Sequence, residues 1–427
     1  MGIFKRYLGK SELFKNVAVL VSGTAIAQAI TLLISPVLTR LFTPEDFAVF
    51  AQFSAIVSIV GVVAAGRYEM AIVLPKSDSH AEELLFLCVL FSLLSFVVTF
   101  LVIIAYDFFF SNDPESYFTN WFYLAPLAVL LSGLYAAFNY WSSRQKTFYL
   151  NSAGRVGMAL LNAAMSLFFG WLGYAFSGLI LGFVLGQLLG VLIMSHKHLL
   201  NFLRDIGSLR FSHLKERGIE YKKFPMVNAP HALVDSIQDN GVVFVLSYYF
   251  LSPIVAFYAH AFRLLKAPVG LIGSAFYQVS YQKLSQMKNN HENVRPFILS
   301  MYKKMFLIGF PFFLPLFLFT PEIFAFIFGE KWLLSGEIAQ ILIPWIFINF
   351  IIAPISCVPL VYGKQTQAFY ITIVDILVRF SALILGGMLN DYKLSFIIIS
   401  AFCSSLLIFA LIWYYYIPLN NEVQKNN

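Results

Sequence analysis

The chain has 427 residues, of which 59% are hydrophobic, 17% aromatic and only 12% charged, and its mean hydropathy is +0.76. A soluble protein of this length could not keep so much apolar surface away from water. The composition therefore excludes a soluble globular protein and predicts an all-α polytopic membrane protein. The net charge of +7 follows from membrane topology, as shown below, and gives no reason to expect a nucleic-acid partner.

Apolar windows of about 20 residues predict twelve membrane-spanning helices. The basic N-terminus precedes an apolar stretch without a small-residue cleavage site, which indicates a retained first span rather than a signal peptide. The predicted spans cover residues 14–39, 44–66, 83–106, 120–141, 148–170, 172–194, 226–250, 253–279, 303–320, 337–362, 367–389 and 394–417.

The distribution of Lys and Arg predicts the orientation. If the N-terminus is cytoplasmic, the segments on that side contain 22 Lys and Arg residues, and those on the opposite side contain only Arg40, Lys331 and Lys393. Such a bias sets the topology of membrane proteins, so both termini are expected in the cytoplasm.

One long polar segment, residues 195–224, separates the first six spans from the last six and carries seven Lys and Arg against three acids. It is interpreted either as a hinge between two moving lobes or as an ordinary positive-inside loop. The predicted domains are an N-terminal six-helix bundle (1–197), a basic cytoplasmic linker (198–224) and a C-terminal six-helix bundle (225–427).

Two stretches indicate an internal repeat. "TPEDFAVFAQF" (43–53) and "SPIVAFYAHAF" (252–262) both begin with a hydroxyl residue followed by Pro, the pattern of a helix start. Gly61 and Gly270 follow at the same spacing. A repeat of this kind would relate the two bundles by an axis along the membrane normal.

Seven charged residues fall in the interior of predicted spans, away from the first and last few positions. Exposing them all to lipid would cost on the order of 20 kcal/mol, so they are expected to face one another, water or a polar ligand. From the rise of the helix, Asp239, Lys266 and Arg379 each lie roughly 18–20 Å from a membrane surface, near the midplane. They predict a charge-lined cavity. The seven residues are Arg155, Asp235, Asp239, Arg263, Lys266, Asp375 and Arg379.

Each of these charges has more than one interpretation. Asp375 and Arg379 have the i,i+4 spacing of an intrahelical ion pair, so a structural pair and a ligand site both remain open. Arg155 is close enough to the end of its span to extend to the interface. Arg263 and Lys266 are three residues apart at mid-depth and cannot both do so, which favours a functional site for an anion.

His231, Asp235 and Asp239 recur every four residues, so a helix would place them on one face. They could neutralise Arg263 and Lys266, or they could couple transport to a proton or another ion. A metal site is the weakest interpretation, because this spacing on one helix is not a specific signature.

No enzyme motif is found: the chain lacks a phosphate-binding Gly loop, a nucleophile elbow and a zinc-type His pair. Cys88, Cys357 and Cys403 lie in apolar runs without ligand spacing and are expected in the core. The sequence thus predicts a protein that is not an enzyme and requires neither a cofactor nor a metal.

Several stretches, in the same order, resemble the Wzx-type polysaccharide flippases of the multidrug/oligosaccharidyl-lipid/polysaccharide (MOP) exporter superfamily. These stretches are "LTRLFTPEDFAVF" (38–50), "GRYEMAIVLPKSDSHAEELL" (66–85), "KKFPMVNAPHALVDS" (222–236), "AFYAHAFRLLKAPVGLIGSAFYQVSYQKLSQ" (256–286) and "IFAFIFGEKWLLSGEIAQIL" (323–342).

The resemblance implies a V-shaped, alternating-access transporter that moves an undecaprenyl-diphosphate-linked oligosaccharide, such as an O-antigen unit of lipopolysaccharide, to the periplasmic leaflet. The implied diphosphate ligands are Arg263, Lys266 and Arg155, with Arg379 at the same depth and with Arg40 and Arg67 at helix ends. Asp235, Asp239, His231 and Asp375 would serve ion or proton coupling. A monomer is expected, with membrane lipid, a polysaccharide polymerase and a chain-length regulator as further partners.

Two other functions remain open. A cation or drug antiporter of the same superfamily would use Asp235 and Asp239 as its principal site. An integral-membrane glycosyltransferase or polysaccharide polymerase would normally need a large outer loop or an acidic metal motif. The outer loops of this chain are predicted to be short, which disfavours that class.

Overall fold

The computed structural model describes residues 2–110, 120–197, 211–250 and 252–426, and every regular element in these ranges is a helix. This confirms the predicted all-α class. The chain divides into two compact units, Met1–Val243 and Phe244–Asn427. Part of the predicted basic linker, residues 198–210, and the loop 111–119 lie outside the described residues, and the predicted domain limits stay a prediction.

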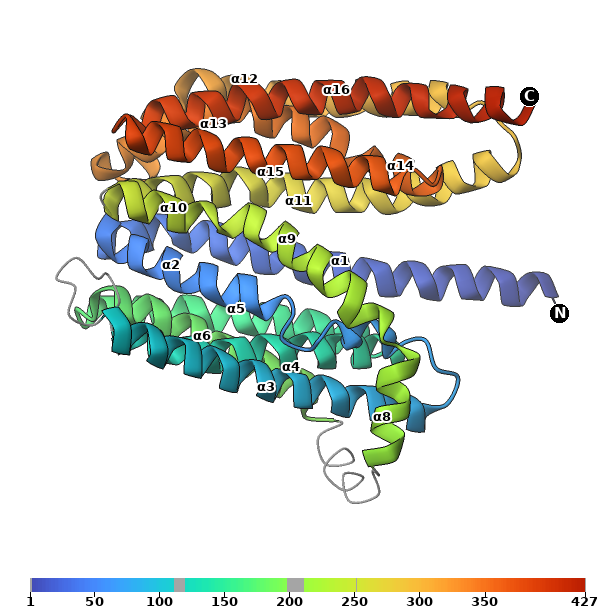
Figure 1. The fold of residues 1–427 in the computed structure, drawn as a ribbon, viewed down its shortest axis with the longest axis horizontal. Helices are drawn as coiled ribbons and strands as arrows, with labels where there is room; N and C mark the ends of the chain where they lie inside the picture. The colour runs from blue at the N-terminus through green and yellow to red at the C-terminus, as the bar shows by residue number, and fades with distance from the viewer. Residues whose placement is uncertain (1, 111–119, 198–210, 251, 427) are drawn as a thin grey trace. The chain divides into compact units, whose positions relative to one another are not determined.

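The first unit is a bundle of long helices. Helix α5 packs against α1 and α6, and α4 packs against α3 and α6; Figure 1 shows α3, α4, α5 and α6 running alongside one another. Its helices are α1 (Gly2–Leu41), α2 (Pro44–Gly61), α3 (Asp78–Phe110), α4 (Ala125–Arg144), α5 (Phe148–Trp171), α6 (Ala175–Ser195), α8 (Phe211–Glu220) and α9 (Ala229–Asn240).

The second unit is also a bundle of long helices. Helix α13 packs against α11, α12 and α16, and α15 packs against α16. Helix α10, whose first two residues belong to the first unit, precedes them. The helices of the second unit are α10 (Val242–Tyr249), α11 (Ser252–Asn289), α12 (Arg295–Phe328), α13 (Leu333–Ile352), α14 (Val358–Val361), α15 (Gln365–Met388) and α16 (Tyr392–Asn426).

Ten helices within the described ranges are long and apolar enough to cross a membrane, so the chain is a multi-pass membrane protein. They account for ten of the twelve predicted spans. The predicted span 44–66 contains α2, a shorter helix that ends at Gly61. The predicted span 226–250 is helical but irregular: a π-turn (Phe224–Asn228), α9 and α10 follow one another, and Gly241 between α9 and α10 keeps helical φ and ψ angles of −66° and −24°.

Helix α2 begins where the sequence predicts a cap. The Thr43 hydroxyl accepts the Asp46 N–H at 3.2 Å, and the Asp46 carboxylate accepts the Thr43 N–H at 2.8 Å, with Pro44 in the first turn. The second Asp46 oxygen accepts the N–H of Phe176, at the start of α6, at 2.8 Å. One carboxylate thereby satisfies donors at the starts of two helices.

Small residues allow α5 and α6 to approach closely. A Cβ atom added at Gly182 would lie 2.3 Å from the Ser166 hydroxyl oxygen, and one at Gly186 would lie 2.7 Å from the Met158 carbonyl oxygen. Close backbone approach through glycine is the usual way in which apolar helices associate in lipid. The pair α5–α6 is therefore closely packed within the first unit.

We expect reporter fusions to place residues 107–119 and 321–336 in the periplasm and residues 195–224 in the cytoplasm. The reason is the Lys and Arg bias, since residues 321–336 carry one cation and 195–224 carry seven. Paired alkaline phosphatase and fluorescent-protein fusions would measure this. A periplasmic 195–224 segment would contradict the orientation.

Candidate functional site

The two cations on α11 differ in their environment. The Arg263 side chain is exposed on the surface of its unit, about 16 Å along the helix from Ser252 by the helical rise. Lys266 is half-buried, and its ammonium lies 5.0 Å from the centre of the Phe262 ring. An exposed arginine on a helix that crosses a membrane needs water or an anion beside it.

A buried histidine precedes Arg263 by one turn. His260 is 6% exposed, and its ring lies 4.6 Å from that of Phe328 and 4.5 Å from that of Trp332. Its Nδ1 is 3.4 Å from the Ser335 hydroxyl oxygen, and that hydroxyl donates to the Phe257 carbonyl at 2.8 Å. His260 therefore anchors α11 against α13. This histidine was not identified from the sequence.

Asp375 and Arg379 on α15 form the ion pair that their spacing predicted. The two residues are only 8% and 7% exposed. The Arg379 guanidinium also lies 4.4 Å from the centre of the Trp345 ring. This arrangement favours the structural alternative for the pair, and a role in ligand binding stays a prediction.

Arg155 connects two helices of the first unit. Its guanidinium donates to the Thr24 hydroxyl of α1, and the Ser152 hydroxyl one turn earlier donates to the Val19 carbonyl at 2.7 Å. The side chain is half-buried. Arg155 therefore contacts α1 within the bundle. This contact was not part of the sequence-based interpretation in which Arg155 extends to the membrane interface.

The remaining two predicted arginines lie at the ends of helices. Arg40 is exposed in the last turn of α1. Arg67 follows Gly66 in a turn where both residues have positive φ angles, 59° and 66° respectively. This turn lies between α2 and a short 3₁₀ helix (Tyr68–Ala71), and the Arg67 guanidinium lies 3.6 Å from the Glu69 carboxylate.

Glu69 is a buried carboxylate that the sequence did not identify. It is 3% exposed, and one of its oxygens has no hydrogen-bond partner among the residues that the structure describes. Burial raises the pKa of Glu69, and this outweighs the opposite effect of the nearby Arg67 charge. Removal from water therefore governs the protonation of this carboxyl, with its long ion pair contributing less.

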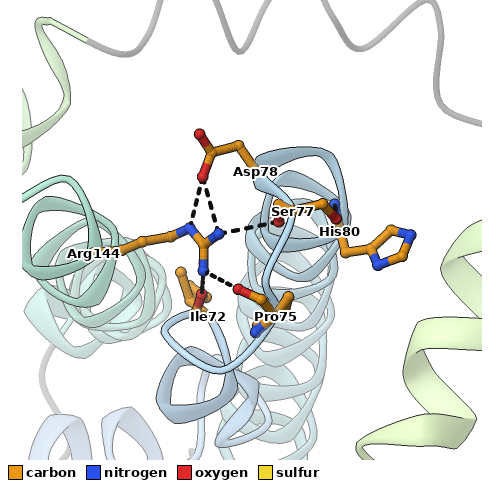
Figure 2. Close-up of polar contacts among 6 residues, drawn as sticks. All are labelled: Ile72, Pro75, Ser77, Asp78, His80 and Arg144. Carbon is orange, nitrogen blue, oxygen red and sulfur yellow. Dashed lines mark hydrogen bonds and ion pairs between the residues drawn. The ribbon is translucent and has the colours of Figure 1, made fainter.

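Arg144, the last residue of α4, holds the connection between α2 and α3. Its guanidinium donates to the carbonyls of Ile72, Pro75 and Ser77 at 2.7–3.1 Å and to the Asp78 carboxylate at 2.9 and 3.0 Å (Figure 2). Its side chain is 11% exposed. Because five polar contacts converge on one guanidinium, the loop 72–78 has a fixed conformation.

We expect Arg144→Gln to destabilise the protein by about 2–3 kcal/mol, because several charge-assisted hydrogen bonds are lost and buried carbonyls lose their donor. The loss of stability is measured as the unfolding temperature in detergent, with size-exclusion chromatography as the detection method. Lys76→Gln is the matched control, since it removes an exposed cation from the same loop. Equal unfolding temperatures for the two variants would contradict the role of Arg144.

A second charge cluster attaches α8 to the same unit. Glu83 is 5% exposed and lies 3.2 Å from the Arg217 Nε and 3.5 Å from the His213 Nδ1. The Tyr68 hydroxyl donates to the Gly218 carbonyl at 2.9 Å. This cluster was not identified from the sequence, because no signal in one sequence pairs Glu83 with a partner 134 residues away.

Helix α9 carries the row of polar residues that the sequence placed on one face. The His231 Nδ1 lies 3.1 Å from the Asp235 carboxylate, and both side chains are exposed. Asp239 is half-buried. The Ser236 hydroxyl donates to the Ser58 carbonyl of α2 at 3.1 Å. The helical row is confirmed, whereas its pairing with Arg263 and Lys266 stays a prediction.

The sequence matches a protein family described as "Polysaccharide biosynthesis protein" over residues 37–337. This match covers most of the chain. The chain belongs to this family. No curated protein matches the sequence.

Solved structures show that this chain has the fold of transporters of the MOP superfamily. The lipid II flippase MurJ, in an inward closed conformation, is similar with a TM-score of 0.66 and 14% identity over 94% of this chain and 90% of that one. An outward-facing multidrug resistance MATE family transporter is similar with a TM-score of 0.64 and 14% identity, over 95% of this chain and 96% of that one. A MOP transporter from Pyrococcus furiosus, described as having a binding pocket of reverse polarity, is similar with a TM-score of 0.58 and 14% identity over 94% of each chain.

The three cysteines of this family member lie in its interior. Cys88, Cys357 and Cys403 are free thiols and buried, as predicted. Within the ranges that the structure covers, no group of three or more His, Cys, Asp and Glu residues could hold a metal ion. The proteins that share its fold are transporters, which agrees with the absence of an enzyme motif.

Proposed function

We propose that the protein is a flippase that moves an undecaprenyl-diphosphate-linked oligosaccharide from the cytoplasmic to the periplasmic leaflet of a bacterial inner membrane by alternating access. Its family is one of polysaccharide biosynthesis. Its fold is shared with a lipid II flippase and with multidrug transporters of the MOP superfamily. Both termini would be cytoplasmic, as the charge bias favours.

The exposed Arg263 on a membrane-spanning helix is the observation that carries this proposal. A diphosphate is expensive to move through hydrocarbon, and a cation lowers that cost. Arg263 and Lys266 would bind the diphosphate. Arg155, Arg40 and Arg67 would contact the cargo at other stages of its passage, whereas Arg379 is already paired with Asp375.

Reconstitution tests this function directly. Purified protein in liposomes that contain an undecaprenyl-diphosphate-linked oligosaccharide should expose the glycan to a glycosidase or lectin on the opposite side faster than protein-free liposomes. The alternative, a cation or drug antiporter, predicts proton-linked movement of a cationic dye instead. Dye movement without glycan movement would favour that alternative.

The polar row on α9 is the proposed coupling element. If Asp235 and Asp239 exchange protons as the transporter changes state, an imposed pH gradient should accelerate flipping by the wild type. It should accelerate Asp235→Asn and Asp239→Asn less. His231, which contacts Asp235, and Asp375 are the secondary candidates for coupling.

The measurement compares flipping in proteoliposomes with and without the gradient. Glu292→Gln is the matched control, because Glu292 is an exposed carboxylate outside this row. If the wild type and both Asp variants respond equally, the acids serve only as structural counter-charges and the coupling resides elsewhere.

A further inference from the structure

We propose that Arg295 binds the phosphate of an anionic phospholipid head group at one end of the second unit. This end contains the last turns of α11, the first turns of α12, and the residues around α14 and Tyr415–Tyr416 of α16. The charge bias places it on the cytoplasmic side. The proposal goes beyond the flippase function and does not depend on which cargo is carried.

Two tyrosine rings hold the Arg295 guanidinium in place. Its Cζ lies 4.2 Å from the centre of the Tyr415 ring and 5.7 Å from that of Tyr416. Its Nε is buried, and the structure shows no hydrogen-bond acceptor for it within the described ranges. Stacking fixes the plane of the guanidinium and leaves its remaining N–H groups for a planar, bidentate acceptor.

The surroundings of Arg295 are strongly basic. Lys288 lies over the Tyr362 ring at 5.2 Å and donates to the Val361 carbonyl. Lys283, Lys303 and Lys304 are exposed on α11 and α12. The sole carboxylate in residues 277–304, 358–365 and 411–418 belongs to Glu292, which accepts a hydrogen bond from Asn290 at 3.0 Å. An excess of cations this large attracts an anion.

Aromatic residues place this region at the level of lipid head groups. Tyr277, Tyr302, Tyr362 and Trp413 pack around one hydrophobic cluster that includes Leu284 and Ile298. Tyrosine and tryptophan gather at membrane interfaces, where one end of the ring is apolar and the other is hydrated. Apolar sequence follows immediately on α12 after Lys304. The phosphate of a lipid in that leaflet therefore lies within reach of these cations.

The chemistry of the site favours a lipid with net negative charge. Phosphate oxygens match the guanidinium fork, and basic surfaces between helices on the cytoplasmic side bind anionic head groups. A zwitterionic lipid also offers a phosphate, but its own ammonium opposes the surrounding lysines. A lipid-linked diphosphate shares the phosphate chemistry, so the experiment must separate it from phospholipid.

The experiment measures lipid binding to full-length protein in nanodiscs of phosphatidylcholine, titrated with spin-labelled phosphatidylglycerol. Wild type should show phosphatidylglycerol bound in preference to spin-labelled phosphatidylcholine. Arg295→Gln should weaken that preference about tenfold, because a charge-assisted bidentate contact is lost. Arg295→Lys should show a preference between those of the wild type and Arg295→Gln. Lys215→Gln, which removes an exposed cation on α8, should leave the preference for phosphatidylglycerol unchanged.

Equal binding of the two phospholipids to wild type would overturn the proposal, and so would the same loss in Arg295→Gln and Lys215→Gln. If only undecaprenyl diphosphate binds in a parallel titration, the site belongs to the cargo and the proposal is again overturned. Should Arg295→Gln fail to fold, Lys303→Gln/Lys304→Gln provides the second test, with a smaller loss of preference expected. Flipping activity is not the readout, so failure here is distinguishable from failure of the flippase function.

Discussion

The double variant Arg263→Ala/Lys266→Ala should lose surface polysaccharide while its protein remains in the membrane at wild-type levels. Each single alanine variant should lower glycan display by about one to two orders of magnitude, because a charge-assisted contact to phosphate is lost. Arg263 is exposed, so its removal leaves no cavity in the core. Glycan display is measured by gel profiles of the surface polysaccharide, and protein level by immunoblotting of membranes.

Two further variants make the result specific. Arg263→Lys retains the charge but not the planar fork, and it should retain part of the activity. Lys283→Ala removes an exposed cation from the same helix and should display glycan normally. Normal glycan display by the double alanine variant would contradict the assignment of the diphosphate site. The fold and the family would be unaffected.

The helical class and most spans could be predicted because hydropathy in a membrane protein is a strong signal. The helices themselves extend further than the apolar windows: α11 continues to Asn289, ten residues beyond the predicted end at 279. Helix α12 begins at Arg295, eight residues before the predicted start at 303. Helical hydrogen bonding does not stop where hydrocarbon ends, so hydropathy marks the bilayer rather than the helix.

The predicted span 226–250 shows what a hydropathy average leaves out. Pro225 and Pro230 are signals of an irregular helix, and the structure has a π-turn over Phe224–Asn228 that continues into α9. The window average concealed these signals because apolar residues surround them. Helices α9 and α10 have only 12 and 8 residues, and this segment is not among the ten clear spans.

The candidate site divides in the same way between local and distant information. The Asp375–Arg379 pair was predicted from its i,i+4 spacing and is present. His231 and Asp235, predicted to share a helix face, lie in contact with each other. The contacts of Arg155 and Glu83 join residues more than 100 positions apart, and no pattern in one sequence reports such pairs. Local periodicity predicts faces of helices, whereas the partner of each face depends on tertiary packing.

Asp375→Ala should be among the most destabilising single substitutions in this chain. Both members of the Asp375–Arg379 pair are buried, and Arg379 stacks on Trp345. Removing the carboxylate leaves a cation without its counter-charge in a site shielded from water, a change that costs about 3–5 kcal/mol in proteins. The expected result is a marked fall in the unfolding temperature in detergent and less protein in membranes.

The double variant Asp375→Leu/Arg379→Met distinguishes loss of pairing from loss of packing. Replacing both charges by apolar side chains of similar size is often neutral or stabilising, because the cost of burying the charges also disappears. It should therefore recover most of the unfolding temperature lost by Asp375→Ala. If the double variant is stable but does not flip the glycan, Arg379 has a role in transport besides pairing. If Asp375→Ala unfolds at the wild-type temperature, the pair is not a structural element, and the ligand-site alternative for Arg379 gains support.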